Sequence, residues 1–344
     1  MLSIFTIAVI VIGLSLLIII HEAGHFFAAK FFGILVEEFG FGLPPRIFGK
    51  KFGETLISFN WLPFGGFVRV YGERHGQEKS DVPITRSFSH QSAGIRAGVI
   101  IAGVAMNFLL GWFLLSAVFM IGIPQSLIVT EIKSGSIAEI ADIQKGDQIF
   151  GFNSISELTD FLKTSEGREI NLQTARAGEK REVRINFSNT LPEDKGKLGV
   201  YLVEAGTSKL GFFSALVSGF IEAWKMSLLI LSGVFQLIVG LFTDWSVFGG
   251  FAGPVGIVNI AAQTAKLGLA NFLQLLSLIS LNLAVFNLLP IPALDGGRLL
   301  FLLIEKIKGR KVEPRKEAVA QAVSFVILIL LILAVTVQDI LRLL

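Results

Sequence analysis

Residues 1–25 read MLSIFTIAVIVIGLSLLIIIHEAGH, and no residue before His21 is charged. About 20 helical residues suffice to cross a bilayer core of roughly 30 Å, so this run predicts a membrane-spanning helix. It ends in His21, Glu22 and His25, and ionisable side chains at membrane depth usually mark a functional site. A cleaved signal peptide is the alternative, but the stretch has no basic start and no small-residue cleavage site. We therefore expect a retained helix with a chemical site at its end.

The composition of the chain also indicates a membrane protein. Of its 344 residues, 52% are hydrophobic and 17% are charged, whereas about 25% are charged in ordinary soluble domains. So few charges disfavour a soluble enzyme, a disordered chain and a nucleic-acid-binding protein. The absence of cysteine excludes disulfides, thiolate metal ligands and a cysteine nucleophile. We expect a multi-span protein that contacts the lipid bilayer and binds no nucleic acid.

Three further stretches without charge are long enough to cross the membrane, namely 97–130, 267–294 and 318–338. A fifth apolar stretch, 210–242, contains Glu222 and Lys225. The expected fold class is a mainly α polytopic membrane protein with four transmembrane helices. A cytosolic-side β-hairpin and one inserted α/β domain complete it.

The distribution of Lys and Arg predicts the orientation of these helices. Residues 28–96 contain nine of them and residues 305–317 contain six, so both connections are expected in the cytosol. Residues 125–209 contain 11 basic and 13 acidic residues, give no such preference, and are expected outside. With four spans, the segment 208–266 must then lie in the membrane plane or re-enter it. A paired crossing that uses residues 247–262 would also preserve this orientation.

The segment 125–207 has a soluble composition. Strand-like runs occur at 127–132, 148–152, 170–175 and 182–187, with a short helix expected at 155–163. The phrase GSIAE (135–139), followed by KGDQI (145–149), resembles a PDZ domain of the bacterial protease type. Such domains usually have Pro at the position of Ile137 and Gly at that of Asp142, so the resemblance does not decide between peptide binding and filtering by size. An unrelated small β-rich domain is the alternative.

His21, Glu22 and His25 form an H-E-x-x-H motif. Positions i and i+4 share a helix face, so both imidazoles can reach one metal ion. Two neutral imidazoles and an oxygen ligand suit tetrahedral zinc. Glu22 is not needed as a ligand and can act as the catalytic base. A polar cap at the membrane interface is the alternative for such a motif.

The third ligand of a zinc ion should lie at the same membrane depth as His21. Residues 287–297 read NLLPIPALDGG and end the third uncharged span on the same, cytosolic side. Pro290 and Pro292 cannot both sit inside a regular helix, so the helix must break and line a cavity. Asp295 is the first acid after this span and is therefore the candidate ligand. An ordinary helix-end residue is the alternative.

Taken together, these motifs resemble the site-2 protease family, specifically the bacterial RseP-like zinc intramembrane metalloproteases. Five motifs occur along this chain in the order that is typical of the family. They are the H-E-x-x-H helix, GGFVR (65–69), the PDZ-like insert, GPVG (253–256) and NLLPIPALDG (287–296). Many relatives carry two PDZ domains, whereas this chain has room for one. In the second span, relatives often have a Pro within the run AGVAMN (102–107), which leaves the role of Asn107 open.

The resemblance implies a Zn2+ ion held by His21, His25 and Asp295, with Glu22 as the catalytic base. It further implies that the substrate is positioned by residues of the hairpin and of the third span, namely Gly65, Gly66, Phe67 and Asn287.

The implied function is that of a zinc metalloendopeptidase that cleaves transmembrane segments of membrane proteins. Expected substrates are anti-sigma factors or signal-peptide remnants, which another protease can trim beforehand. The expected location is a bacterial inner or plasma membrane, with the active site toward the cytosol and the PDZ-like domain outside. The alternatives are a catalytically silent membrane scaffold and a membrane zinc peptidase with a Glu ligand from another helix.

The predicted segments follow in chain order. They are helix 1 with its motif (1–30), the hairpin connection (31–96), helix 2 (97–124), the PDZ-like domain (125–207), the in-plane or re-entrant segment (208–266), helix 3 with Asp295 (267–304), a basic cytosolic loop (305–317) and helix 4 (318–344).

Overall fold

The computed structural model of the protein describes residues 4–73, 82–165, 168–176, 179–186, 198–243 and 253–343. Parts of the hairpin connection, of the PDZ-like domain and of the segment 208–266 therefore lie outside the described residues. The chain forms two compact units. One unit comprises Met1–Ala117 and Leu216–Leu344, and the other comprises Val118–Ala215. Each unit is described by itself.

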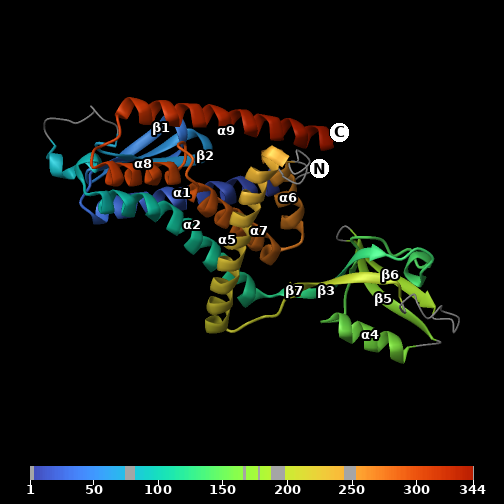
Figure 1. Ribbon diagram of the computed structural model, residues 1–344. Coiled ribbons are helices and arrows are strands. Elements are labelled where there is room, and N and C mark those ends of the chain that lie inside the picture. Colours follow the sequence, from blue (N-terminus) through green and yellow to red (C-terminus); the bar gives the residue numbers. More distant parts are fainter. Residues whose placement is uncertain are drawn as a thin grey trace. The chain divides into compact units, whose positions relative to one another are not determined.

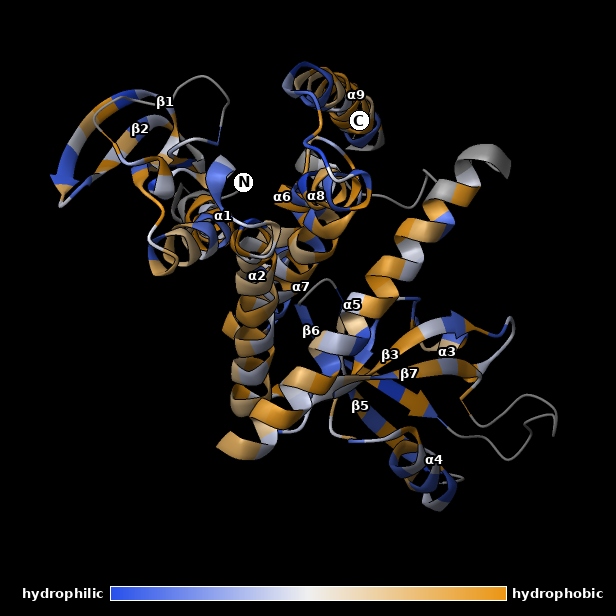
Figure 2. Cartoon of the chain, turned by 60° about the vertical axis from the view of Figure 1, so that its left-hand side comes forward, coloured by the Kyte–Doolittle hydropathy of each residue, from blue (hydrophilic) through white to orange (hydrophobic). Residues whose placement is uncertain are grey.

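Long apolar helices build the first unit (Figure 1). Its described helices are α1 (Ile4–Phe31), most of α2 (Ala93–Ile121), most of α5 (Phe212–Thr243), α6 (Pro254–Lys266), α7 (Leu269–Leu288), α8 (Asp295–Lys308) and α9 (Pro314–Leu343). Hydrophobic residues predominate along α2 and α5 in Figure 2. A helix satisfies its own backbone hydrogen bonds, which is what allows apolar segments of this length to cross a bilayer.

Within the described residues, five helices are long and apolar enough to cross a membrane by length and composition. They are Ile10–Phe31, Ala93–Ile121, Phe212–Leu237, Leu269–Leu288 and Pro314–Leu341. The prediction of a mainly helical protein with several apolar spans and β-sheets is confirmed. The number of four crossings stays a prediction. The segment expected to lie in plane or re-enter forms one continuous helix of 32 residues, α5, followed after a gap by the 13 residues of α6.

Small residues let α1, α2 and α7 approach one another closely. A Cβ atom on Gly24 of α1 would lie 2.3 Å from the carbonyl oxygen of Ala102 on α2. On the other side of α2, Ser277 and Ser280 of α7 donate hydrogen bonds of 2.8 Å to the carbonyls of Gly111 and Asn107. These contacts fix α2 between α1, which carries His21 and His25, and α7, which precedes the break before Asp295.

The connection between α1 and α2 begins with a long antiparallel hairpin of β1 (Val36–Phe52) and β2 (Thr55–Val70). The base of the hairpin is buried, whereas large apolar side chains are exposed at its tip (Phe52) and in its middle (Trp61). Strand β2 packs along α1. Strand β2 of the hairpin therefore runs next to the H-E-x-x-H motif.

The chain breaks between α7 and α8 and folds tightly over the first turn of α8. The two glycines after Asp295 make this turn possible. A Cβ atom on Gly296 would lie 2.2 Å from the carbonyl oxygen of Leu289, and one on Gly297 would lie 2.3 Å from that of Ile291. Asp295 is the first residue of α8 and is held in place by this close packing.

The second unit contains a five-stranded antiparallel sheet with the strand order β6-β5-β4-β3-β7. Its elements are β3 (Ile123–Ile132), α3 (Ile137–Ile140), β4 (Gln148–Ile149), α4 (Ile155–Thr164), β5 (Glu169–Arg176), β6 (Glu179–Asn186) and β7 (Val200–Thr207). One cluster of buried apolar residues forms its core. The four expected strands and the helix are present, and β7, which pairs with β3, is additional. The PDZ-like identity of this unit stays a prediction.

Asp142, where glycine is usual in PDZ-like relatives, has a left-handed backbone with φ 59°. Its carboxylate accepts a hydrogen bond of 3.0 Å from Arg181. Nearby, Arg176 binds the buried Asp147 through two hydrogen bonds of 2.8 and 2.9 Å. Burial alone would raise the pKa of Asp147, but the Arg176 guanidinium holds it below its usual range. These ion pairs thus stabilise the turn at Asp142, whose left-handed backbone conformation glycine adopts more easily.

Candidate active site

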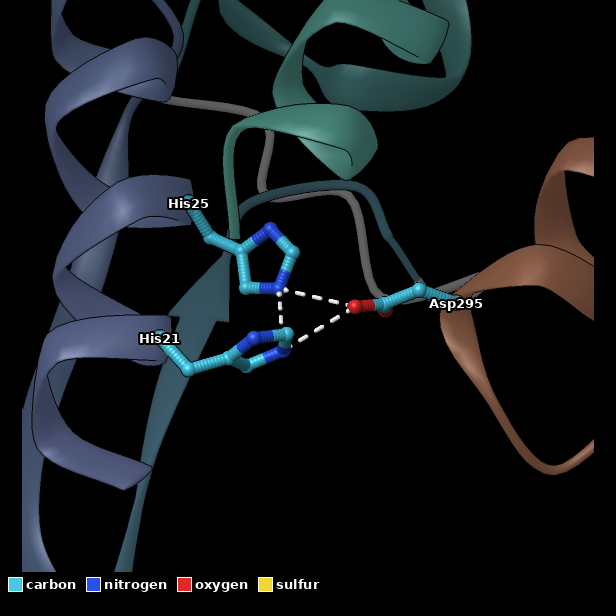
Figure 3. A group of neighbouring side chains, drawn as sticks. All are labelled: His21, His25 and Asp295. Atoms are coloured by element: carbon cyan, nitrogen blue, oxygen red, sulfur yellow. Dashed lines mark hydrogen bonds and ion pairs between the residues drawn. The ribbon is translucent and has the colours of Figure 1, made fainter. Parts of the chain in front are cut away.

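His21 and His25 project from one face of α1 toward the same point (Figure 3). Their rings pack edge to face with centroids 4.8 Å apart, and the two Nε2 atoms lie 3.2 Å from each other. Both residues are buried, with exposed fractions of 7% and 9%. The i, i+4 spacing of the motif accounts for this arrangement because α1 continues through it without a break.

Asp295 reaches the same point from the first turn of α8 (Figure 3). Its Oδ2 atom lies 3.0 Å from His21 Nε2 and 3.3 Å from His25 Nε2. These three residues thus form a compact group of potential metal ligands although 270 residues separate His25 from Asp295 in the chain.

The protonation of His25 indicates that this group suits a cation. His25 Nδ1 lies 2.9 Å from the carbonyl oxygen of Val99, and a carbonyl can only accept, so Nδ1 carries the proton. In the neutral ring, Nε2 then has a lone pair directed at Asp295 Oδ2. That oxygen is buried and has no hydrogen-bond partner among the described residues. The lone pairs of His25 Nε2 and Asp295 Oδ2 repel each other when they face one another. A metal ion bound between them would replace this repulsion with attraction.

The spacing of the three atoms also fits zinc. Ligand atoms placed tetrahedrally at 2.0–2.1 Å from a zinc ion are about 3.3 Å apart. The three observed separations are 3.0, 3.2 and 3.3 Å. The donor set, two imidazoles and a carboxylate, is one that zinc accepts in catalytic sites that keep a fourth position open.

Glu22 lies beside this group and is not part of it. It lines a cavity of about 260 Å³ together with the three potential ligands and with Phe67 and Val68 of β2. A carboxylate next to the metal position, but free of the metal, is suited to exchange protons with a water molecule or substrate in the cavity.

The predicted substrate-positioning residues of the hairpin lie at this cavity or next to it. A Cβ atom on Gly66 would be 3.7 Å from Cγ of Glu22 and 2.9 Å from the carbonyl oxygen of Gly40. Gly65 has a φ of +94°, which favours glycine. Phe67 lines the cavity and packs against Gly40. Asn287 is half-buried in the last turn of α7, and its predicted role stays a prediction.

Helix α2 contributes to the site in a way that sequence reasoning missed. Besides the Val99 carbonyl, a Cβ atom on Gly103 would lie 2.4 Å from the His25 ring, so only glycine fits there. Asn107 contacts His21 from the same helix. The one available signal was the presence of polar and small residues in an otherwise apolar span.

An ion pair between Arg298 of α8 and Glu73, which follows β2, was also missed. Both residues line the cavity, and the Arg298 guanidinium lies 5.9 Å from the centre of the Phe88 ring. The pair connects the helix that carries Asp295 to the end of the strand beside Glu22.

Comparison with known proteins gives consistent matches over almost the whole chain. The sequence profile described as "Peptidase family M50" matches residues 9–331. "Zinc metalloprotease RasP" of Oceanobacillus iheyensis is 31% identical, over 98% of this chain and 99% of the relative. A protein of the same name from Shouchella clausii is 29% identical over 96% and 97%. "Regulator of sigma-W protease RasP" of Bacillus subtilis is 28% identical over 98% and 99%.

Proposed function

The chain belongs to peptidase family M50 and is a zinc metalloprotease, and we propose that it cleaves peptide bonds within membrane-spanning segments of other proteins. The observation that carries this proposal is the convergence of His21, His25 and Asp295 beside the apolar helix α1. Both histidines belong to the candidate span Ile10–Phe31, which supports a metal site at membrane depth. In a soluble peptidase, metal ligands are not expected on a helix that is apolar enough to cross a membrane.

In this proposal His21, His25 and Asp295 hold the zinc and Glu22 is the catalytic base. When bound, zinc polarises the scissile carbonyl and activates water for attack. Glu22 takes the proton from the attacking water and delivers it to the leaving nitrogen, which completes hydrolysis. Glu22 lines the same cavity as the three potential ligands, so its carboxylate can reach a water molecule or substrate there.

The hairpin is proposed to hold the substrate next to Glu22. A helical substrate hides its carbonyl groups in hydrogen bonds and must unwind before one of them can be attacked. Strand β2 can bind an extended segment through backbone hydrogen bonds, which do not depend on the side chains of the substrate. Gly65, Gly66 and Phe67 are proposed to shape this edge, and Asn287 to contact the substrate from α7.

The biological role is proposed to be regulated intramembrane proteolysis in a bacterial membrane. The name of the Bacillus subtilis relative, a regulator of sigma-W protease, supports anti-sigma factors as one substrate class. Remnants of signal peptides are a second class with the same property, a single apolar segment left in the bilayer. Either can reach the enzyme after another protease has trimmed it outside the membrane.

The active site is proposed to face the cytosol and the second unit to lie outside, because basic residues cluster in residues 28–96 and 305–317. The chain has no cysteine, so single cysteines can be placed at exposed lysines. We expect Lys163→Cys to react with an impermeant thiol reagent in intact cells. Lys50→Cys and Lys308→Cys should react only after permeabilisation. Labelling of Lys308→Cys from outside would contradict the proposed orientation.

A further inference from the structure

Asn107 is a polar residue that the proposed mechanism does not use. It lies in the middle of α2, is fully buried, and belongs to a span without charges. Its amide nitrogen is 3.3 Å from His21 Nδ1, whereas its Oδ1 atom has no hydrogen-bond partner among the described residues. An amide oxygen without a partner in an apolar interior is costly, so it requires an explanation.

The chemistry of a zinc ligand supplies that explanation. His21 Nε2 is the atom that faces Asp295 and His25, and it can bind a metal only through its lone pair. In the neutral ring the proton must then reside on Nδ1, which becomes a donor and needs an acceptor. An amide nitrogen cannot accept, but turning the Asn107 amide by half a rotation presents Oδ1 instead.

We propose that Asn107 is a positioning residue whose Oδ1 accepts the Nδ1–H hydrogen bond of His21 and thereby directs Nε2 at the zinc. The backbone carbonyl of Val99 occupies the corresponding position for His25, at 2.9 Å from Nδ1. Both ligand histidines are thus oriented from α2. Gly103 lies between these two points and lets the helix approach the rings.

The surroundings of Asn107 prevent other groups from replacing it. The residue is 0% exposed, so solvent does not reach the His21 Nδ1 atom past it. The helix position is fixed by Ser280, whose hydroxyl donates a 2.8 Å hydrogen bond to the Asn107 carbonyl. Removal of the side-chain acceptor would leave a buried N–H group without a partner and would permit the other tautomer of His21.

The test compares the zinc affinity of the full-length protein with that of Asn107→Leu and Asn107→Asp, by competition with a chelator. The leucine side chain has nearly the same size but no acceptor, whereas aspartate keeps an oxygen. We expect Asn107→Leu to weaken zinc binding by about 10–100-fold, as loss of an outer-shell partner usually does. Asn107→Asp should bind zinc about as tightly as the wild type. The absorption spectrum of the cobalt-substituted protein should change only in the leucine variant.

Ser116→Ala is the matched control, since it removes a buried hydroxyl of the same helix that bonds the Trp112 carbonyl, more than two turns beyond Asn107, and should leave zinc affinity and the cobalt spectrum unchanged. If Asn107→Leu does not fold, Asn107→Ala removes the same acceptor and should show the same loss. Wild-type affinity and spectrum in the folded variant without the acceptor would overturn the proposal, as would an equal loss in Asn107→Asp. The inference rests on the proposed zinc site. A wild type that binds no zinc at His21 and His25 would instead refute that site.

Discussion

Glu22→Gln is expected to reduce cleavage by at least about 100-fold, the lower end of what a positioned acid–base group usually contributes. The amide has the size of the carboxylate but cannot take the proton from water. The three potential ligands are unchanged, so zinc should remain bound at the wild-type ratio. The measurement is the rate of cleavage of a single-span substrate in proteoliposomes, with the zinc content determined on the same preparation.

Glu182→Gln provides the control for this variant because Glu182 is exposed on β6 in the second unit. It should cleave at the wild-type rate. Undiminished cleavage by Glu22→Gln would show that another group is the base. Loss of zinc from Glu22→Gln would indicate that Glu22 is a ligand instead.

Asp295→Ala is expected to release zinc and to lose cleavage together. Its Oδ2 atom is one of only three donors that converge in the described part of the site. Zinc affinity should therefore fall by more than the roughly 10–100-fold that loss of an outer-shell partner costs. Chelator competition and metal analysis of the purified protein measure this loss.

Asp295→Asn serves as the graded comparison, because its amide oxygen remains a weak ligand without charge. We expect its zinc affinity to lie between those of the wild type and Asp295→Ala. Since Asp295 is also the acid in the first turn of α8, the folding of each variant should be compared by thermal unfolding. A folded Asp295→Ala that retains zinc with wild-type affinity would rule out this residue as a ligand.

Local patterns were sufficient to predict which residues meet at the site. The i, i+4 spacing of His21 and His25 fixes their relative position on any helix. For Asp295, the argument required only that two apolar spans end at the same membrane depth and that the PxP sequence break the second. The first condition follows from the length of the spans and the distribution of Lys and Arg beside them, and the second from the backbone chemistry of proline.

The contribution of α2 could not be predicted in the same way. The Val99 carbonyl is a backbone group and leaves no trace in the sequence. The need for glycine at position 103 arises from the His25 ring, which lies 78 residues away in the chain. Asn107 was visible as a polar residue in an apolar span, but its partner depends on how α1 and α2 pack.

The length of the helix in the segment after residue 208 could not be predicted from local patterns. The counts of Lys and Arg beside the spans favoured an in-plane or re-entrant segment, which stays a prediction. Glu222 and Lys225 occupy neighbouring positions on one helix, with Lys225 Nζ 3.9 Å from a Glu222 oxygen. The helix continues through them from Phe212 to Thr243. Strand β7 was missed for a related reason: its pairing with β3 depends on a chain reversal over about 70 residues, which no local pattern reports.

The position of the scissile bond tests the central claim most directly. The purified protein is reconstituted with a substrate that has one transmembrane segment and soluble regions on both sides, and the products are identified by mass spectrometry. The account predicts a cut within or at the edge of the apolar segment that stops when zinc is chelated and resumes when zinc is restored. A cut confined to the soluble regions, or one that persists without zinc, would contradict it.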